Sequence, residues 1–359
     1  MEGFGWYTYE VVKRIVCAHP EHEFYFLFDR PYDPKFIFAK NVTPIVLNPP
    51  ARHPVLFIYW FEIAVRKALK KHSIDLFFSP DGYLSLSSSV KQVIAIHDIN
   101  FEHHPRDLPF TARLYLRYFF PRFARKATEI ITVSHYSLKD IETLYGVASD
   151  RISYCWNGAS EEYVPLDDIS IKLVRNKYSS GEPYFLFVGS MHPRKNLLRL
   201  LRAFSEFKKR EGSSMKILLV GTSMWGRDKE LEQLIHSLGD DVIITGHLEK
   251  DELCKVTAAA FALTFVPYYE GFGIPIVEAM RCGVPVICGN RTSLPEVAGD
   301  AALLCDPFDE HAISERMTEL ATDDILYMEF KRKGLERSTI FNWDQTALHV
   351  WKVIEKHLK

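Results

Sequence analysis

Short apolar runs rich in Val, Ile and Phe alternate along the chain with longer segments whose apolar residues recur at helical spacing. This alternation predicts parallel sheets covered by helices on both faces, the α/β class. In the first half, strands are expected at residues 23–28, 43–47, 75–79, 92–96, 129–133 and 152–156. Helices are expected near residues 6–18, 55–72, 110–126 and 135–145.

A polar stretch from Gly158 to Pro183 interrupts the alternation, and we expect it to be irregular. Beyond it, strands are expected at residues 184–189, 216–221, 242–245, 261–266, 284–288 and 302–305. Helices are expected near residues 196–210, 228–238, 250–259, 274–282, 309–322 and 324–337. The pattern predicts two doubly wound, Rossmann-like domains, residues 1–165 and 166–342, followed by a last helix at 343–359.

The chain opens with Gly3, Phe4 and Gly5, directly followed by a helical run. A glycine loop that feeds a helix normally follows the first strand of a doubly wound domain. Here no strand precedes the glycines. We expect a piece of about 15–20 residues carrying the first strand to be missing, with a differently built domain as the alternative.

Composition limits the possible partners and compartments. The 359 residues carry a net charge of −2, so nothing global favours nucleic acid. The six cysteines show no C-x-x-C or Cys/His metal spacing, which favours a reducing cytoplasm. No secretory signal opens the chain, and no apolar run approaches the roughly 18 residues that span a bilayer.

The first candidate site is the segment FVGSMHPRKN at residues 187–196. A strand ends there, Gly189 lets the backbone turn, and Arg194 and Lys195 are expected at the start of a helix. Helix N-termini favour phosphate, and an Arg fork with a mobile Lys charge suits a diphosphate. A solvated basic pair in a loop is the alternative.

The second candidate site contains two acids eight positions apart, Glu270 and Glu278. Glu270 follows an apolar strand and precedes two glycines, and Glu278 lies in the helix after them. A carboxylate at the end of a buried strand is where doubly wound sheets bind ligands, and it can accept bonds from sugar or ribose hydroxyls. The alternative makes Glu270 a surface loop residue and Glu278 a partner of the helix dipole.

At these motifs the sequence resembles the family 4 retaining glycosyltransferases, which have the GT-B fold and include bacterial polysaccharide mannosyltransferases. The resemblance covers essentially the whole second half of the chain, where the motifs occur in the family's order. They are FVGSMHPRKN (187–196), TGHLEKDEL (245–253), EGFGIPIVEAMRCGVPVI (270–287) and SLPEVAGDAALLCDP (293–307). The first half adds AIHD (95–98), TVSHYS (132–137) and WNG (156–158). The resemblance implies two domains facing a cleft, with the helix 343–359 packing back on the first domain.

The resemblance also implies residue roles. Arg194 and Lys195 would hold the donor diphosphate, Glu270 the transferred sugar and Glu278 the ribose. Gly246 and His247 would contact the base, and the backbone amides of Phe272, Gly273 and Ile274 would contact the sugar. Gly189 and Ser190, at the end of the strand 184–189, would complete the donor site. Gly3, Phe4, Gly5 and His97 would serve the acceptor side, with His97 catalytic beside the transferred sugar.

The resemblance implies transfer of a hexose from a GDP- or UDP-sugar to a saccharide or lipid-linked acceptor, with retention. No cofactor or metal is expected, because no D-x-D pair follows a strand and Arg194 with Lys195 can serve as the cation. GDP-mannose is the favoured donor. Two alternatives stay open: a non-catalytic or impaired sugar-nucleotide binder, and another GT-B enzyme such as a nucleotide-sugar epimerase or a sugar phosphorylase.

A basic aromatic segment at residues 104–126 suggests a membrane contact. It carries six Arg or Lys residues against one acid, with six Phe or Tyr residues between them. A helix of this kind can lie on an anionic bilayer at the inner face of the membrane. The alternative is an ordinary amphipathic helix with aromatic residues in the core and arginines in solvent.

Overall fold

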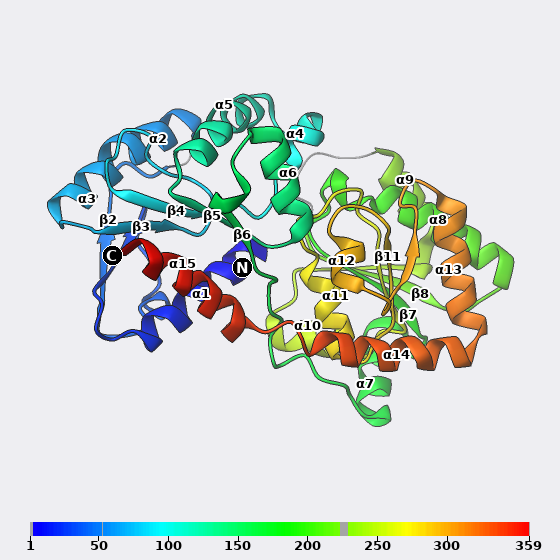
Figure 1. Cartoon of the computed structure of the whole chain (residues 1–359). Helices are drawn as coiled ribbons and strands as arrows, with labels where there is room; N and C mark the ends of the chain where they lie inside the picture. Colours follow the sequence, from blue (N-terminus) through cyan, green and yellow to red (C-terminus); the bar gives the residue numbers. More distant parts are fainter. Residues whose placement is uncertain (1–2, 52, 223–228, 359) are drawn as a thin grey trace. The chain divides into compact units, whose positions relative to one another are not determined.

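The structure is a computed structural model that describes residues 3–51, 53–222 and 229–358 (Figure 1). The chain divides into two compact units. Unit 1 consists of Met1–Asn157 and Asn342–Lys359, and unit 2 of Gly158–Phe341. Each unit contains parallel strands joined by helices, as the alternation of apolar runs predicts.

Unit 1 begins with a helix and ends with one. Its strands are β1 (Phe24–Phe28), β2 (Val42–Val46), β3 (Leu76–Ser79), β4 (Lys91–Ala95), β5 (Glu129–Thr132) and β6 (Ile152–Tyr154). Its α-helices are α1 (Gly3–Ala18), α2 (Pro54–Tyr59), α3 (Arg66–Lys71), α4 (Asn100–His103), α5 (Phe110–Lys126), α6 (His135–Tyr145) and α15 (Trp343–Leu358). A π-helical turn, Trp60–Val65, joins α2 to α3, so the helix expected at 55–72 is one run with a widened middle.

The strands of unit 1 form two parallel sheets: β1 pairs with β2, and β3, β4, β5 and β6 pair in that order. Every residue of β5 is buried, whereas the aromatic residues of β1 are only half-buried. Among the strands that the structure describes, β1 pairs only with β2 and β3 only with β4. Both strands therefore have one open edge. The expected absence of a first strand stays a prediction.

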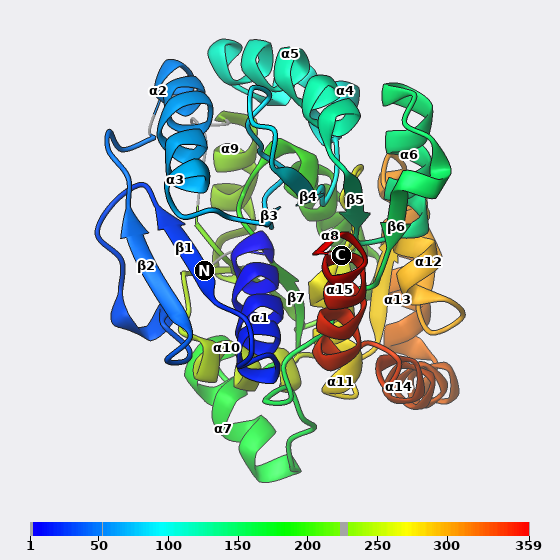
Figure 2. The same ribbon diagram turned by 60° about the vertical axis from the view of Figure 1, so that its left-hand side comes forward.

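Helix α15 packs against α1, side by side with it in Figure 2. Arg14 of α1 bonds to Asp344 at the start of α15, with 2.5 Å between Nε and Oδ1. At the other end, Lys356 and His357 both bind the buried carboxylate of Glu129, at 2.8 and 2.7 Å. These bonds join the last helix to the first helix and to β5, although more than 200 residues of sequence separate Glu129 from the C-terminus.

Unit 2 is a parallel sheet of six strands in the order β12–β11–β10–β7–β8–β9. The strands are β7 (Tyr184–Val188), β8 (Lys216–Val220), β9 (Val242–Gly246), β10 (Ala262–Phe265), β11 (Val286–Gly289) and β12 (Leu303–Cys305). The helices are α7 (Asp168–Ser179), α8 (Leu197–Glu211), α9 (Lys229–Leu238), α10 (Lys250–Ala258), α11 (Ile274–Arg281), α12 (Leu294–Ala298), α13 (Glu310–Thr322) and α14 (Asp324–Ser338).

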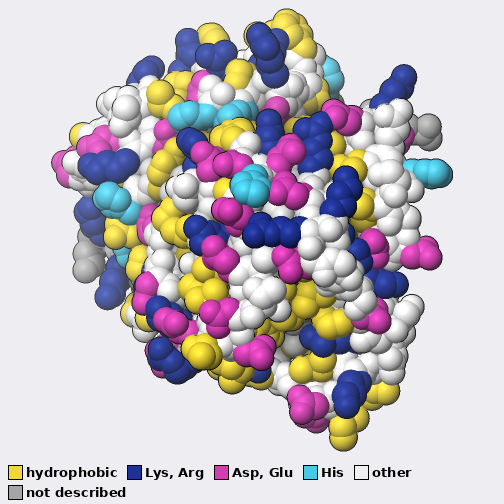
Figure 3. All heavy atoms as spheres, turned by 90° about the vertical axis from the view of Figure 1, so that its right-hand side faces the viewer, with side chains coloured by type: hydrophobic (Ala, Val, Ile, Leu, Met, Phe, Trp, Pro, Cys, Tyr) yellow, Lys and Arg dark blue, Asp and Glu magenta, His cyan; other side chains and the backbone are white. Residues whose placement is uncertain are grey.

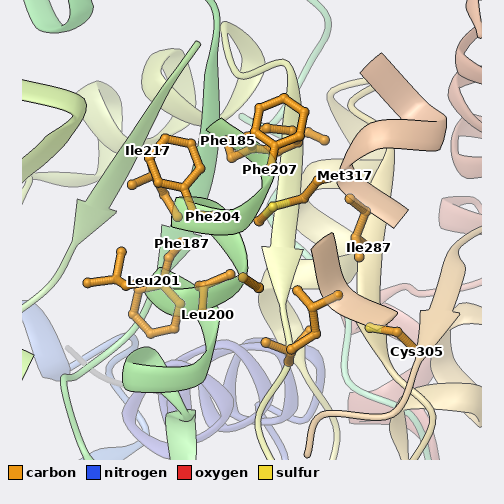
Figure 4. Close-up of a cluster of buried hydrophobic side chains, with 14 of the residues drawn as sticks. Phe185, Phe187, Leu200, Leu201, Phe204, Phe207, Ile217, Ile287, Cys305 and Met317 are labelled. Carbon is orange, nitrogen blue, oxygen red and sulfur yellow. The ribbon is translucent and has the colours of Figure 1, made fainter. Parts of the chain in front are cut away.

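The core of unit 2 lies between the sheet and helices α8 and α13. Leu200, Phe204 and Phe207 of α8 recur at spacings of four and three residues, so they lie on one face, and all three are fully buried. Phe185 from β7 meets Phe207 edge to face, with 5.3 Å between the ring centroids. Figure 4 shows these rings beside Met317 of α13. This packing fixes the end of β7, from which the site begins.

The stretch from Gly158 to Pro183 is not irregular throughout, because it contains helix α7. Asp167 caps this helix by accepting a bond from the amide of Ser170, 2.7 Å away. Val174 is buried, and Arg175 donates to the carbonyl of Ala259 at 3.0 Å. Val174 is the buried apolar residue of α7, so the helix depends on its cap and on contacts with α10 that the sequence pattern does not reveal.

The surface and the cysteines agree with the composition. Figure 3 shows Lys and Arg side chains intermixed with Asp and Glu over one face of the molecule. All six cysteines are free thiols, and four of them are buried. Within the described ranges, no helix combines the length and the apolar character needed to span a bilayer.

Candidate functional site

Three neighbouring strands of unit 2 end in glycine at the same edge of the sheet: Gly189 after β7, Gly221 after β8 and Gly246 at the end of β9. All three have positive φ. A Cβ on Gly221 would lie 1.9 Å from the carbonyl oxygen of Gly189, so the two strand ends touch through their backbones. Gly221 was not among the expected site residues. Its only signal was a glycine at the end of the apolar run KILLVG.

Arg194 and Lys195 lie in a 3₁₀ turn, Pro193–Lys195, that precedes α8. They were expected at the start of the helix itself, which begins only at Leu197. Asn196 separates the turn from the helix with a left-handed backbone, φ 63°. Its side-chain amide donates to the carbonyls of Val266, at 3.0 Å, and Pro307, at 2.6 Å. These bonds fasten the basic turn to the ends of β10 and β12.

The two cations meet the carboxylate of Glu270. Arg194 donates from Nη1 to Oε1 of Glu270 at 2.6 Å and to the carbonyl of Tyr269 at 3.2 Å. The amine of Lys195 bonds to the same oxygen, and it lies 4.9 Å from the centre of the Phe265 ring. Lys195 is 8% exposed and Glu270 is 7% exposed. The sequence placed these residues at two separate motifs, and the fold joins them into one cluster.

The electrostatics of this cluster favour an anion. Burial alone would raise the pKa of the Glu270 carboxyl, but the adjacent Arg194 and Lys195 outweigh burial and hold that pKa below its ordinary value. The carboxylate is therefore charged at neutral pH, and two cations facing one anion leave a net positive charge. A second anion could take up that charge with charge-assisted hydrogen bonds.

Backbone amides lie next to Glu270. Helix α11 begins at Ile274 after Gly273, whose φ of 101° allows the chain to turn into the helix. The first turn of a helix presents amide groups without intrahelical partners, and these favour phosphate. Gly273 is tightly placed, because a Cβ there would lie 3.0 Å from Cδ2 of Leu294. Phe272, Gly273 and Ile274 follow Glu270 within four residues, and their contact with a donor stays a prediction.

Ser293 holds the Glu270 loop in position and was not expected in the site. Its buried hydroxyl lies 2.9 Å from the carbonyl of Glu270 and 3.2 Å from the carbonyl of Phe272. The amide of Glu270 in turn donates to the hydroxyl of Thr292 at 3.2 Å. Ser293 begins the motif SLPEV and Thr292 precedes it, and the position of the motif after a strand was the available signal.

Glu278 lies in α11 and is partly buried. Tyr163 donates its phenolic hydroxyl to the Glu278 carboxylate, and Lys250 acts on it through its charge. Burial raises the pKa of Glu278 to about 7, and the Tyr163 bond and the Lys250 charge offset that rise in part. Tyr163 was not expected in the site, because it lies in the stretch interpreted as a linker.

The segment around Tyr163 belongs to unit 2. Glu162 forms an ion pair with Lys250, with 2.5 Å between Oε1 and Nζ, and Tyr163 is 3% exposed. The structure therefore divides the chain after Asn157, and not at residue 165 as the sequence pattern suggested. Polar composition marked this segment as a linker, but two specific bonds attach it to α10 and α11.

The other expected donor-side residues lie at the same strand ends. Ser190 follows Gly189, and its carbonyl accepts a bond from the amide of His192 at 2.8 Å. Gly246 has φ 71° at the end of β9, and His247 after it is exposed, 4.0 Å from the carboxylate of Glu249. The His247 side chain is exposed to solvent.

His97 lies in unit 1, where β4 ends. Its Nε2 donates to the carbonyl of Pro80 at 2.8 Å, which leaves Nδ1 as the acceptor of the ring. The Tyr7 ring meets it edge to face, with 4.6 Å between the centroids. Burial lowers the pKa of His97, so the ring is neutral at neutral pH. A ligand group that donates to Nδ1 would find this ring fixed in orientation.

Gly3, Phe4 and Gly5 do not form a loop. They make the first turn of α1, where the hydroxyl of Thr8 donates to the carbonyl of Phe4 at 2.9 Å. A Cβ on Gly3 would contact nothing within 4 Å, so no close approach explains that glycine. The expectation of a glycine loop was wrong because the helical bonding of α1 extends further toward the N-terminus than the sequence indicated.

Metal ligation has no candidate in the described ranges, where no group of three or more His, Cys, Asp and Glu side chains could hold an ion. Metal independence was expected from the family resemblance and stays a prediction. Arg194 and Lys195, both paired with Glu270, are two cations at this edge of the sheet.

Two family models match the chain. Residues 2–163 match the model described as Glycosyltransferase Family 4, and residues 170–337 match the model described as Glycosyl transferases group 1. Arg194, Lys195, Glu270 and Glu278 all fall within the second match.

Relatives and solved structures agree with these matches. O-antigen chain mannosyltransferase B from Escherichia coli is 30% identical over 96% of this chain and 93% of its own length. O-antigen chain mannosyltransferase RfbU from Salmonella typhimurium is 29% identical over 71% of this chain and 67% of its own. The structure of sucrose-phosphate synthase from Thermosynechococcus elongatus superposes with a TM-score of 0.81 at 20% identity, covering 99% of this chain and 93% of that one, which shows the GT-B fold. The chain belongs to the family 4 glycosyltransferases.

Proposed function

We propose that this glycosyltransferase moves a hexose, with mannose favoured, from a GDP- or UDP-sugar to a saccharide or lipid-linked saccharide. Unit 2 would bind the donor and unit 1 the acceptor. The reaction would retain the anomeric configuration and require no metal. The preference for mannose is supported by the two related proteins that are named as O-antigen chain mannosyltransferases.

The observation that carries the proposal is the cluster of Arg194, Lys195 and Glu270 beside the first turn of α11. Two cations with an excess positive charge suit a diphosphate, and the α11 amides can add hydrogen bonds to it. Glu270 orients both cations before the donor arrives. In this proposal the pyrophosphate takes over part of their bonding, and Glu270 is then available to a sugar hydroxyl.

The same groups support the chemistry. When the bond between the anomeric carbon and the phosphate oxygen breaks, positive charge develops on the sugar and negative charge on the nucleotide. Arg194 and Lys195 would stabilise the departing diphosphate where that charge appears. The acceptor oxygen would bond to the same face of the anomeric carbon, and its proton would pass to a phosphate oxygen. No protein nucleophile is required in this scheme.

Glu278 would bind the ribose hydroxyls of the donor, and His97 a hydroxyl of the transferred sugar. The neutral His97 ring, with Nδ1 as acceptor, suits a hydroxyl donor. The base would lie along the backbone at Gly246 and His247. We place the acceptor at the cytoplasmic face of a membrane, reached through residues 104–126, in polysaccharide or lipopolysaccharide synthesis.

Thermal unfolding of the full chain with UDP, GDP, ADP and their sugar conjugates tests the donor. A ligand that binds only the native state raises the melting temperature, by an amount equivalent to about 2.7 kcal/mol at a hundred times Kd. We expect the largest rise with GDP or GDP-mannose. Absence of a rise with any of these nucleotides would refute the donor site.

A transfer assay with NMR of the anomeric proton tests retention, and the same assay in EDTA tests metal independence. His97→Ala should abolish transfer while leaving the nucleotide-induced rise in melting temperature unchanged. If His97→Ala transfers sugar at the normal rate, His97 has no role at the reacting sugar.

A further inference from the structure

Two helices of unit 1 expose apolar side chains that nothing in the described chain covers. Phe110, Leu114 and Tyr118 recur every four residues along α5 and are 63%, 54% and 55% exposed. On α2 and the π-helical turn after it, the exposed apolar residues are Val55, Ile58, Tyr59 and Ile63. These seven side chains make up a large share of the exposed large apolar residues of the protein, and we call them the apolar face.

The two helices lie side by side, as Figures 1 and 2 both show. Beneath the apolar face, Phe57 of α2 and Tyr115 of α5 meet with 6.0 Å between their ring centroids. Both rings also pack near Tyr83, which is stacked with Phe57 at 5.3 Å. The aromatic residues that face inward therefore supply the core contact of both helices. The exposed apolar residues are additional to that contact.

The alternative interpretation of 104–126, an ordinary amphipathic helix, accounts for only one side of α5. It explains the burial of Tyr115, Phe120 and Phe123. It predicts polar residues on the opposite side, where Phe110, Leu114 and Tyr118 lie. A helix that is apolar on both sides needs a second apolar or interfacial environment.

The two segments that carry the apolar face are rich in cations. Residues 104–126 contain six Arg or Lys residues and one acid. Residues 53–71 contain four Arg or Lys residues and one acid, although the net charge of the whole protein is −2. The single acid of the second segment, Glu62, is occupied by the backbone amides of Leu86 and Ser87, at 2.6 and 2.9 Å. Arg117 is paired with Glu102 at 3.0 Å, and the two segments keep an excess of positive charge after that pair is counted.

Two cations stack on aromatic residues of the apolar face. The Arg122 guanidinium lies 3.5 Å from the centre of the Tyr118 ring, and that of Arg113 lies 5.2 Å from the centre of Phe110. Aromatic rings accompanied by Arg suit the boundary between lipid headgroups and acyl chains, where the ring is buried and the guanidinium meets phosphate.

We propose that the apolar face of α2 and α5 binds the surface of an anionic phospholipid bilayer. Its seven apolar side chains would enter the headgroup region, and the flanking Arg and Lys residues would contact lipid phosphates. This inference rests on the proposed function in one respect, the lipid-linked acceptor, which would lie in the bilayer that the apolar face binds. Vesicle binding is measured without a sugar nucleotide, so failure of either proposal leaves the other open to its own test.

Vesicle flotation of the full chain tests this surface, with phosphatidylcholine vesicles and with vesicles that also contain phosphatidylglycerol. We expect binding to the anionic vesicles alone, reduced by high salt. The triple variant Phe110→Ser, Leu114→Ser, Tyr118→Ser should weaken binding at least about ten-fold, because apolar burial and charge act together. The matched control is Ile169→Ser with Leu173→Ser on α7, two exposed apolar residues of unit 2 that should not affect binding.

Two further measurements separate the outcomes. The triple variant should keep its melting temperature and its nucleotide-induced rise, which shows that the variant is folded. Equal flotation of the triple variant and the control would overturn the proposal. So would a wild-type protein that ignores vesicles but forms dimers that the triple variant loses, because the apolar face would then bind a second copy of the chain.

Discussion

The amine of Lys195 is bonded to the carboxylate of Glu270 in a buried contact between two segments that lie 75 residues apart in the sequence. Arg194 shares the same carboxylate oxygen. The pairing keeps a buried positive charge compensated before any ligand binds, since an isolated buried cation is costly. It also fixes both cations at the strand ends where a diphosphate would bind.

Replacing Lys195 by Ala should remove donor binding and slow transfer. One cation and one anion then remain, Arg194 and Glu270, so the excess positive charge that would attract a diphosphate is lost. Loss of one such stabilising donor typically costs about 10²–10³ in rate. The nucleotide-induced rise in melting temperature and the transfer rate are the measurements. Lys209→Ala, an exposed lysine near the end of α8, is the control. A normal rise in Lys195→Ala would remove Lys195 from the site.

Nucleotide binding should strengthen with pH through the titration of Glu278. The pKa of this carboxyl is raised from 4.5 to about 7, so the group is half protonated near neutral pH. The ionised form is the stronger acceptor for two ribose hydroxyls, and affinity should therefore rise between about pH 6 and pH 8. Glu278→Gln should bind the nucleotide more weakly. Its affinity should also lose the pH dependence caused by Glu278, so that only the dependence from titration of the nucleotide itself remains. Calorimetry of GDP binding over that range is the measurement.

The raised pKa of Glu278 also makes the stability of the fold depend on pH. Stability should fall as the pH rises, whereas nucleotide affinity should increase. The folded protein holds this proton more tightly than the unfolded chain does. The contribution of Glu278 to stability is thus present below pH 4.5 and is lost as the pH rises through about 7. Without ligand, the melting temperature of the wild type should fall more than that of Glu278→Gln over this window. If the melting temperatures of the wild type and Glu278→Gln change with pH in parallel, the raised pKa of Glu278 is contradicted.

Tyr163→Phe should move the pH dependence of binding upward. The hydroxyl of Tyr163 donates to Glu278 and lowers its pKa, so removing that hydroxyl raises the pKa further. The midpoint of the binding curve should shift to higher pH, with affinity at high pH retained. Tyr184→Phe is the matched control, because it removes a buried hydroxyl of unit 2 that bonds to the carbonyl of Val256 at 2.6 Å. An unchanged midpoint in Tyr163→Phe would make Tyr163 a packing residue only.

Local patterns in the sequence were sufficient to predict most elements of the fold. The apolar run YFLFVG forms β7, and the apolar spacing of 196–210 forms α8, because each depends on residues close together in the chain. Arg194, Lys195, Glu270 and Glu278 were proposed in the same way, from their expected positions at the ends of strands and in the first turns of helices. The two-domain α/β class followed from the repetition of such units.

What the sequence could not predict depends on contacts between distant segments. The bond from Tyr163 to Glu278 spans more than 100 residues, and the segment that carries Tyr163 has the polar composition of a linker. Helix α7 escaped prediction because one cap and its contacts with α10 stabilise it more than its own apolar pattern does. The exposed apolar side chains of α2 and α5 form one face because the two helices lie side by side, which the sequence does not indicate.

Gly221→Ala should destabilise the protein more than other substitutions of positive-φ glycines. A Cβ at this position would lie 1.9 Å from the carbonyl oxygen of Gly189, and φ of 143° is accessible to few residues other than glycine. Relief requires β7 and β8 to move apart at the site, at a cost of about 3 kcal/mol or more. Gly212→Ala provides the comparison. It also has positive φ, 55°, but its Cβ would meet no atom within 4 Å, so about 1–2 kcal/mol is expected. Melting temperature and soluble yield of the full chain report both variants. Equal losses in the two variants would show that the ends of β7 and β8 do not touch at Gly189 and Gly221.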